Sequence, residues 1–196
     1  MRVTYRSSQD VSLTPIWVLL GLNFLFFIAT LINRNLVITT FGLQPASFIS
    51  EPWTIITNLF VHGSFWHIFA NMLTLFFFGS YLLRLVGEGR FLIVYFLGGI
   101  VGNVMFIVLG YSFATAIGAS GAIFALGGAL AIMRPKLKVI IFPIPIPMDL
   151  WIAVIGGFLV VSFLPSIAWQ AHLGGMVLGL LAGYFFRRRE RRIFRR

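Results

Sequence analysis

Apolar residues follow one another in long runs along this chain, and polar residues cluster in the short segments between the runs. A helix needs about 20 apolar residues to cross the hydrocarbon core of a bilayer. The runs predict six membrane-spanning helices, at about 15–32, 66–84, 91–110, 118–134, 148–164 and 168–186. The fourth and fifth runs are short, so we expect their helices to need support from neighbouring helices.

The composition supports a membrane location. Of the 196 residues, 59% are hydrophobic and only 10% are charged, whereas soluble domains carry about 25% charged residues. We therefore expect a single all-α integral membrane domain over residues 1–196. The chain contains no cysteine, which excludes disulfides and thiolate chemistry. The polar segment before the first run lacks a small-residue cleavage site, which favours a retained helix over a signal peptide.

The basic residues predict the orientation of these helices. If the N-terminus is cytoplasmic, all of the fifteen Lys and Arg residues except Arg34 fall in cytoplasmic segments, as the positive-inside rule requires. An even number of spans then places both termini in the cytoplasm. The net charge of +10 is concentrated in the tail at 187–196, which we interpret as an anchor to anionic lipid headgroups rather than a nucleic-acid-binding segment.

Two connecting segments are unusual. The outer loop at 33–65 is long and rich in aromatic and aliphatic residues. We expect it to lie partly within the outer leaflet, with Trp53 and Trp66 at the interface. On the cytoplasmic side, proline alternates with other residues over 142–147, which predicts an extended, rigid connector.

Four polar side chains from three predicted spans share one depth near the outer face. Ser120 lies at the start of the fourth span, His172 at the start of the sixth, and His67 and Asn71 lie one turn apart at the start of the second. Each has an ordinary structural interpretation when taken alone, as a back-bonded serine or an interhelical amide. Together they suggest function, because ionisable groups at membrane depth are rare, and a histidine can activate a serine as its general base.

Small residues form a stripe on each of the two spans that carry the serine and the histidine. The stripe on the sixth span is His172, Gly175, Gly179 and Gly183, and that on the fourth span is Gly121, Ala125 and Ala129. Small residues at this spacing allow two helix backbones to approach closely. If the stripes face each other, the serine and the histidine come within hydrogen-bond reach.

These residues stand in motifs that resemble those of the rhomboid family of intramembrane serine proteases, in its minimal six-helix prokaryotic form. The matching segments are GASG at 118–121, AHLGGMVLGLLAG at 171–183 and HGSFWHIFAN at 62–71. The resemblance covers about residues 45–186. It implies a six-helix bundle with Ser120 as nucleophile and His172 as general base. It also implies that the side chains of His67 and Asn71 act as oxyanion-hole donors.

The backbone N–H of Ser120 is a further candidate oxyanion donor, because it lies at the positive end of the helix that begins there. Gly118 and Gly121 would let backbone and substrate approach closely, and Gly175 and Phe124 would support His172. Phe124 stands where the family often has a tyrosine against the catalytic histidine, so it can stack but offers no hydroxyl.

Two other positions depart from the family pattern. Thr54 follows Trp53 where the family commonly has an arginine, and Leu83 stands where it often has a glutamate. We expect these changes to alter how the outer loop is anchored. They remove none of the proposed catalytic groups.

A carboxylate usually orients the histidine of a serine protease. Of the five acidic residues, four fall on the predicted cytoplasmic side and one lies in the outer loop rather than in a span: Asp10, Glu88, Asp149 and Glu190, and Glu51 respectively. We therefore expect a Ser–His dyad. No cofactor or metal is expected, because His62 and His67 have no glutamate between them and do not form an HExxH zinc motif. No paired halves with broken helices are evident, which disfavours a transporter.

The sequence therefore predicts a serine endopeptidase that cleaves in or near transmembrane segments of other membrane proteins. The alternative is a catalytically inactive rhomboid-like protein that binds transmembrane clients. Such proteins commonly lack the serine or the histidine, whereas this chain keeps both. We expect a multi-pass protein of the plasma membrane with its active site toward the outer leaflet. The natural substrate and the oligomeric state have no signature in the sequence.

Overall fold

The computed structural model describes residues 11–141, 144–162, 164 and 167–193, and these are mostly helical. Predictions that concern Arg2, Arg6 and Asp10 lie outside the described residues. The elements follow in the order α1 (Thr14–Ile32), α2 (Arg34–Phe41), α3 (Thr54–Thr57), η1 (Asn58–Phe60), α4 (Phe65–Thr74), η2 (Leu75–Gly79), α5 (Ser80–Val86), α6 (Glu88–Leu109), α7 (Ser120–Met133), β1 (Lys138–Ile141), β2 (Ile144–Asp149), α8 (Leu150–Ser162) and α9 (Trp169–Ile193).

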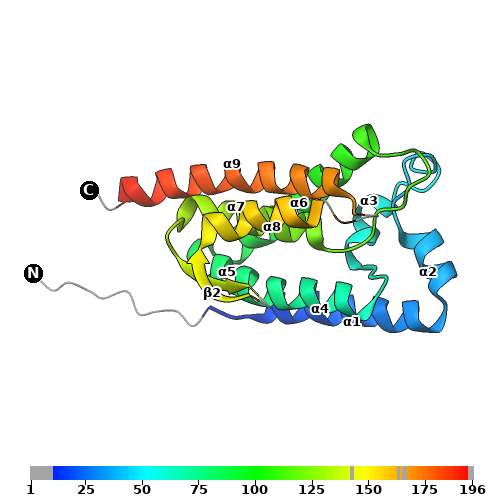
Figure 1. Cartoon of the computed structure of the whole chain (residues 1–196), viewed down its shortest axis with the longest axis horizontal. Coiled ribbons are helices and arrows are strands. Elements are labelled where there is room, and N and C mark those ends of the chain that lie inside the picture. Colours follow the sequence, from blue (N-terminus) through cyan, green and yellow to red (C-terminus); the bar gives the residue numbers. More distant parts are fainter. Residues whose placement is uncertain (1–10, 142–143, 163, 165–166, 194–196) are drawn as a thin grey trace, which may run out of the picture.

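The helices form an elongated bundle (Figure 1). α9 runs along one side and α1 along the opposite side, with α6 and α7 between them. The first turn of α1 and the last turn of α9 lie at the same end of the bundle, and α2 and α3 lie at the other end. A helix lies over each of the six predicted spans, with bounds that differ from the predicted ones at most ends.

Three helical stretches among the described residues are long and apolar enough to cross a membrane, at Thr14–Ile32, Phe65–Val86 and Glu88–Leu109. α7 and α8 are apolar but shorter. α9 is long, but it begins with polar side chains and ends in a run of arginines. The crossing of all six helices therefore stays a prediction.

Small residues bring α6, α7 and α9 into backbone contact, as the two stripes predict. A β-carbon added to Gly179 would overlap the backbone of Ala125, and one added to Gly183 would meet the Ala129 carbonyl oxygen at 2.5 Å. On the other face of α9, Gly174 would meet Val101 of α6 at 2.9 Å. Because no side-chain layer separates these helices, their positions are closely coupled.

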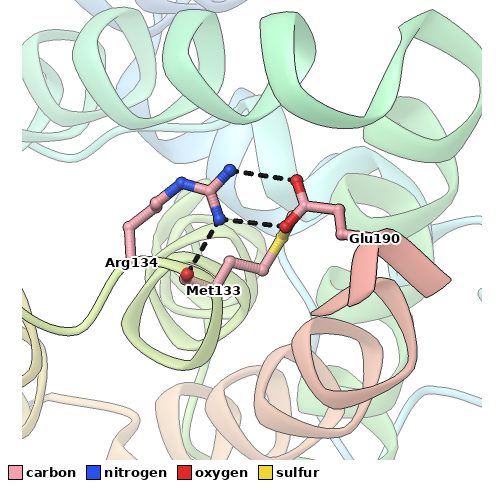
Figure 2. Close-up of polar contacts among 3 residues, drawn as sticks. All are labelled: Met133, Arg134 and Glu190. Carbon is pink, nitrogen blue, oxygen red and sulfur yellow. Dashed lines mark hydrogen bonds and ion pairs between the residues drawn. The ribbon is translucent and has the colours of Figure 1, made fainter. Parts of the chain in front are cut away.

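An ion pair joins α7 to α9 near the C-terminal ends of both helices (Figure 2). The Arg134 guanidinium donates to both carboxylate oxygens of Glu190 at 3.0 Å and also to the Met133 carbonyl at 2.9 Å. Arg187 donates to the Ile132 carbonyl at 3.0 Å. These contacts satisfy carbonyl groups that the C-terminal end of α7 leaves free, and they hold α9 beside it.

The segments that the sequence predicts to be cytoplasmic carry more secondary structure than expected. The proline-containing stretch is extended, but residues 144–147 belong to β2, which pairs antiparallel with β1 in a hairpin, and residues 142–143 lie outside the described part. Lys138 and Asp149 close the hairpin with an ion pair of 2.7 Å. The predicted tail begins as a continuation of α9, which stays helical to Ile193.

The outer loop at 33–65 also carries its own structure, in α2, α3 and η1. The Trp53 indole donates to the Thr40 carbonyl at 2.9 Å, and the Arg34 guanidinium donates to the Gly63 carbonyl. Leu43 and Ala116 exchange backbone hydrogen bonds of 3.0 and 2.8 Å, which ties this loop to the segment before α7. The loop is therefore a folded layer over one end of the bundle.

α8 packs less tightly than its neighbour α7, whereas the shortness of the fifth span predicts that it needs support from neighbouring helices. Among its described residues only Leu150, Ala153 and Val154 are buried, and all three lie in its first half. A β-carbon added to Gly156 or Gly157 would contact nothing. The second half of α8 therefore has few neighbours to hold it in place.

Candidate active site

Ser120 and His172 meet at the outer-loop end of the α7–α9 pair. Ser120 is the first residue of α7, and His172 lies in the first turn of α9. The Ser120 Oγ lies 2.7 Å from the His172 Nε2, which is a short hydrogen bond. The two residues are 52 positions apart in the chain, so the backbone contact between the glycine stripes is what brings them together.

The two ring nitrogens of His172 have different surroundings. The side chain is only 6% exposed, and its buried Nδ1 has no hydrogen-bond partner among the described residues. If the proton sits on Nδ1, then Nε2 is free to accept the Ser120 hydroxyl proton. The pair therefore has the geometry of a nucleophile with its base.

The Phe124 ring packs on the His172 ring, with centroids 4.7 Å apart and planes inclined by 34°. Phe158 of α8 also packs on Phe124, edge to face, with ring centroids 5.9 Å apart. Phe124, which the sequence predicts to be able to stack on the histidine, thus lies against the His172 ring in a tilted arrangement. Aromatic packing restricts the orientation of the imidazole where a carboxylate would otherwise do so.

A glycine with a positive φ lies two residues before the serine. Gly118 has a φ of +113°, which residues with a side chain rarely adopt. His67 lies against it: a β-carbon on Gly118 would come within 2.6 Å of the His67 Nε2. The predicted placement of His67 beside the serine-bearing loop is therefore present, and only glycine leaves room for it.

His67 and Asn71 share one face of α4. The Ser64 hydroxyl caps this helix by accepting the His67 N–H at 3.2 Å. Asn71 is 7% exposed and donates one amide hydrogen to the His67 carbonyl at 2.8 Å, while its buried Oδ1 has no partner in the part of the chain that the structure describes. Its second amide hydrogen remains available. No hydrogen bond joins Asn71 to Ser120 or His172 within the described residues.

His62 is a buried histidine to which the sequence assigned no role. Its side chain is 0% exposed, its Nδ1 lies 3.2 Å from the Phe60 carbonyl oxygen, and its ring contacts that of His67 at 4.8 Å. Burial, together with the nearby charge of His67, lowers the pKa of His62 from 6.5 to about 3. His62 is therefore neutral at physiological pH and packs beneath His67. The only feature of the sequence that singled out His62 was its position as the first residue of the HGSFWH segment.

The positions that depart from the motif pattern are occupied by structural residues. Thr54 is fully buried and its hydroxyl donates to the Glu51 carbonyl at 2.6 Å. Leu83 is fully buried in the main hydrophobic core. Trp53 reaches α2 instead of depending on an arginine beside it. These contacts anchor the outer loop in this chain.

Comparison with known proteins finds a matching family model. Residues 50–189 match the family model described as "Rhomboid domain". Over 157 residues the chain is 33% identical to "Putative rhomboid protease YdcA" of Bacillus subtilis, a match that covers 79% of this chain and 77% of that protein.

Two further relatives come from Saccharomyces cerevisiae and Arabidopsis thaliana. The chain is 29% identical over 179 residues to "Rhomboid protein 1, mitochondrial" of Saccharomyces cerevisiae, covering 77% of this chain and 48% of that protein. It therefore spans about half the length of the yeast relative. It is also 36% identical over 80 residues to "Inactive RHOMBOID-like protein 8" of Arabidopsis thaliana, covering 41% of this chain and 22% of that protein.

Proposed function

The chain belongs to the rhomboid family, and on this basis we propose that it is an intramembrane serine endopeptidase with a Ser–His dyad. The observation that carries the proposal is the 2.7 Å hydrogen bond between the Ser120 Oγ and the His172 Nε2. The substrates would be transmembrane segments of other proteins, since a site at this end of an apolar bundle is reached from the lipid. No cofactor is needed for this chemistry.

The reaction would proceed in two stages. The Ser120 Oγ attacks the carbonyl carbon of the scissile bond while the His172 Nε2 takes the hydroxyl proton. The same proton passes to the leaving amine as the C–N bond breaks, which leaves an acyl ester on Ser120. Water then attacks the ester, His172 takes a proton from it, and this proton returns to the Ser120 Oγ as the new carboxylic acid departs.

The negative charge of each tetrahedral intermediate needs hydrogen-bond donors. The backbone N–H of Ser120 is one, because the first N–H groups of α7 have no partner within the helix and lie at its positive end. The His67 imidazole and the free amide hydrogen of Asn71 are the others. Loss of one such donor typically lowers the rate by about a hundredfold or more.

The proposed orientation follows from charge and helix direction. The helices at all six predicted spans cross the membrane, the basic end of α9 faces the cytoplasm, and the site lies toward the outer leaflet. The structure supports this orientation because the start of α1 and the end of α9 lie together, opposite the outer loop (Figure 1). The plasma membrane is the proposed location. Reporter fusions at both termini test the orientation, and a periplasmic or extracellular signal from either contradicts it.

The alternative is that the protein binds transmembrane segments without cleaving them. The likeness to a relative named as inactive keeps this alternative open. A non-catalytic protein has no need of an activated serine, so reactivity of Ser120 separates the two functions.

Purified protein in detergent or liposomes, incubated with a model transmembrane substrate, tests the proposal. We expect cleavage that Ser120→Ala or His172→Ala abolishes, and covalent labelling of Ser120 by a fluorophosphonate. Ser162→Ala is the matched control, because the Ser162 hydroxyl only donates to the Phe158 carbonyl of its own helix at 2.7 Å. Full activity in either dyad variant refutes the catalytic assignment, and substrate binding without cleavage or labelling establishes the alternative.

A further inference from the structure

Two buried asparagines from distant parts of the chain form hydrogen bonds to each other beside the segment that leads into Ser120. Asn58 begins η1 in the outer loop, and Asn103 lies in the second half of α6. The Asn58 Nδ2 donates to the Asn103 Oδ1 at 3.0 Å, and the Asn103 Nδ2 donates to the Asn58 Oδ1 at 2.7 Å. The side chains are 2% and 3% exposed. Each amide is thus both donor and acceptor of one closed pair.

The pair also holds backbone groups on both sides. The Asn103 Nδ2 donates to the Ile55 carbonyl at 2.8 Å, and the Asn58 Nδ2 lies 3.4 Å from the Ala116 carbonyl. The Asn58 carbonyl accepts the Gly118 N–H at 2.8 Å. Through these bonds α6 is connected to the outer loop and to the segment that leads into Ser120.

The hydrogen bond to Gly118 has a direct bearing on the proposed oxyanion pocket. Because the Asn58 carbonyl occupies the Gly118 N–H, that group is not an oxyanion donor. The same hydrogen bond fixes the peptide on the N-terminal side of Gly118. Gly118 has a φ of +113° and lies against His67. A rotation of this peptide would move the start of α7 and the Ser120 N–H with it.

The same turn of α6 also contacts the residue before His172. Gly102 precedes Asn103, and a β-carbon there would overlap the carbonyl oxygen of Ala171, the residue before His172. One turn of α6 therefore contacts the chain next to His172 directly and the chain next to Ser120 through Asn58. The same turn of α6 therefore restricts the positions of both Ser120 and His172.

We propose that Asn58 and Asn103 form a positioning pair for the active site, which holds the Ala116–Gly118 segment so that the donors at the start of α7 face the oxyanion. The pair does not touch substrate and acts through Gly118. Its catalytic part rests on the proposed function, whereas its structural part, the protection of the Gly118 N–H, does not.

Hydrogen exchange tests the structural part without any need for proteolysis. In Asn103→Leu we expect the Gly118 amide to exchange at least about tenfold faster than in the wild type, since its acceptor is no longer held. Asn23→Leu is the matched control: Asn23 is another fully buried asparagine, but its Nδ2 donates to the Leu19 carbonyl within α1. Unchanged exchange at Gly118 in a folded Asn103→Leu protein overturns the proposal.

Kinetics test the catalytic part. Asn103→Leu should lower kcat about tenfold or more with KM within about twofold, and should slow fluorophosphonate labelling of Ser120 by a similar factor. Asn23→Leu should keep kcat near the wild-type value even if it lowers the thermal midpoint. An equal loss of kcat in both variants would show that only stability is involved, and would overturn the positioning role.

Two double-mutant cycles sharpen the result. Asn58→Ala and Asn103→Ala should each have most of the effect of the double variant, because either one breaks the pair. These smaller substitutions also serve if Asn103→Leu does not fold. Combined with His67→Ala, Asn103→Ala should cost less than the product of the single effects, since both act on one pocket; fully multiplicative effects contradict this. If the wild type neither cleaves nor labels, the proposed function fails, while the exchange result still decides the structural part.

Discussion

Gly175 of α9 lies against the backbone of Gly121 in α7 so closely that a β-carbon on Gly175 would overlap the Gly121 carbonyl oxygen. Gly121 follows Ser120 directly, and Gly175 lies about one turn after His172. The closest backbone contact between the two helices is thus adjacent to the hydrogen bond between the serine and the histidine. The distance between the helix backbones at this point determines whether that bond forms.

Gly175→Ala should therefore impair both stability and cleavage. The added methyl group must push α9 away from α7, and overpacking of this kind costs about 1–3 kcal/mol. We expect a lower thermal midpoint in detergent and a loss of at least about tenfold in kcat, measured at a temperature where the variant is folded. Gly21→Ala is the control, because a β-carbon at Gly21 contacts nothing. Wild-type activity in Gly175→Ala would show that the spacing of the helices is not critical.

Phe124→Leu should lower the cleavage rate by about threefold to tenfold, because the ring that packs on the His172 imidazole is lost and such packing contributes about 0.5–1.5 kcal/mol. Phe124→Tyr should retain the rate, since the ring is kept. Phe158→Leu separates orientation from packing: Phe158 contacts Phe124 but forms no ring pair with His172. Steady-state kinetics of the three variants give the comparison, and equal losses in Phe124→Leu and Phe158→Leu would contradict a specific role in orienting the histidine.

The ion pair between Arg134 and Glu190 should stabilise the fold measurably. Both side chains are about one-third exposed and the contact is bidentate, so we expect Arg134→Ala to lower the free energy of unfolding by about 1 kcal/mol. Lys138→Ala should have a smaller effect, because the Lys138 side chain is 65% exposed in its pair with Asp149. Chemical unfolding in mixed micelles measures both. The order of the two effects is the test, and a larger loss for Lys138→Ala contradicts it.

Acid should destabilise the protein through His62. The pKa of this residue is about 3 in the folded state, because burial disfavours the imidazolium, and 6.5 is its ordinary value. As the pH falls from about 6.5 to about 3, the unfolded chain takes up a proton that the folded chain does not, so stability falls over this range and is unaffected above it. Thermal unfolding from pH 7.5 to pH 4.5 should show a shallower pH dependence in His62→Asn than in the wild type. Parallel curves would contradict the assignment.

The meeting of Ser120 with His172 was predictable because its cause is periodic. Small residues repeated every four positions on two apolar helices, and such stripes dictate close contact wherever they face each other. Phe124 was predictable for the same reason, since it lies one turn below the serine. Local spacing, read along a helix, was sufficient in both cases.

Other contacts have no local signature. Glu190 lies in a run of arginines and was interpreted as part of a basic tail, whereas its partner Arg134 is 56 positions away. Asn58 and Asn103 pair across 45 positions, and nothing near either one marks it as buried. Polar pairs of this kind depend on how helices are arranged in three dimensions, which hydropathy along the chain does not encode.

The second predicted span contains a π-helical segment, η2, and this segment affects which faces the two halves of the span present to their neighbours. A π turn holds one more residue than an α turn, and each residue in an α-helix rotates the chain by about 100°. Above η2 the helix presents His67 and Asn71, and below it the helix buries Leu82 and Leu83. The extra residue therefore adds a fixed rotational offset between the two halves of the helix, so that His67 and Asn71 can face the proposed site while Leu82 and Leu83 face the hydrophobic core.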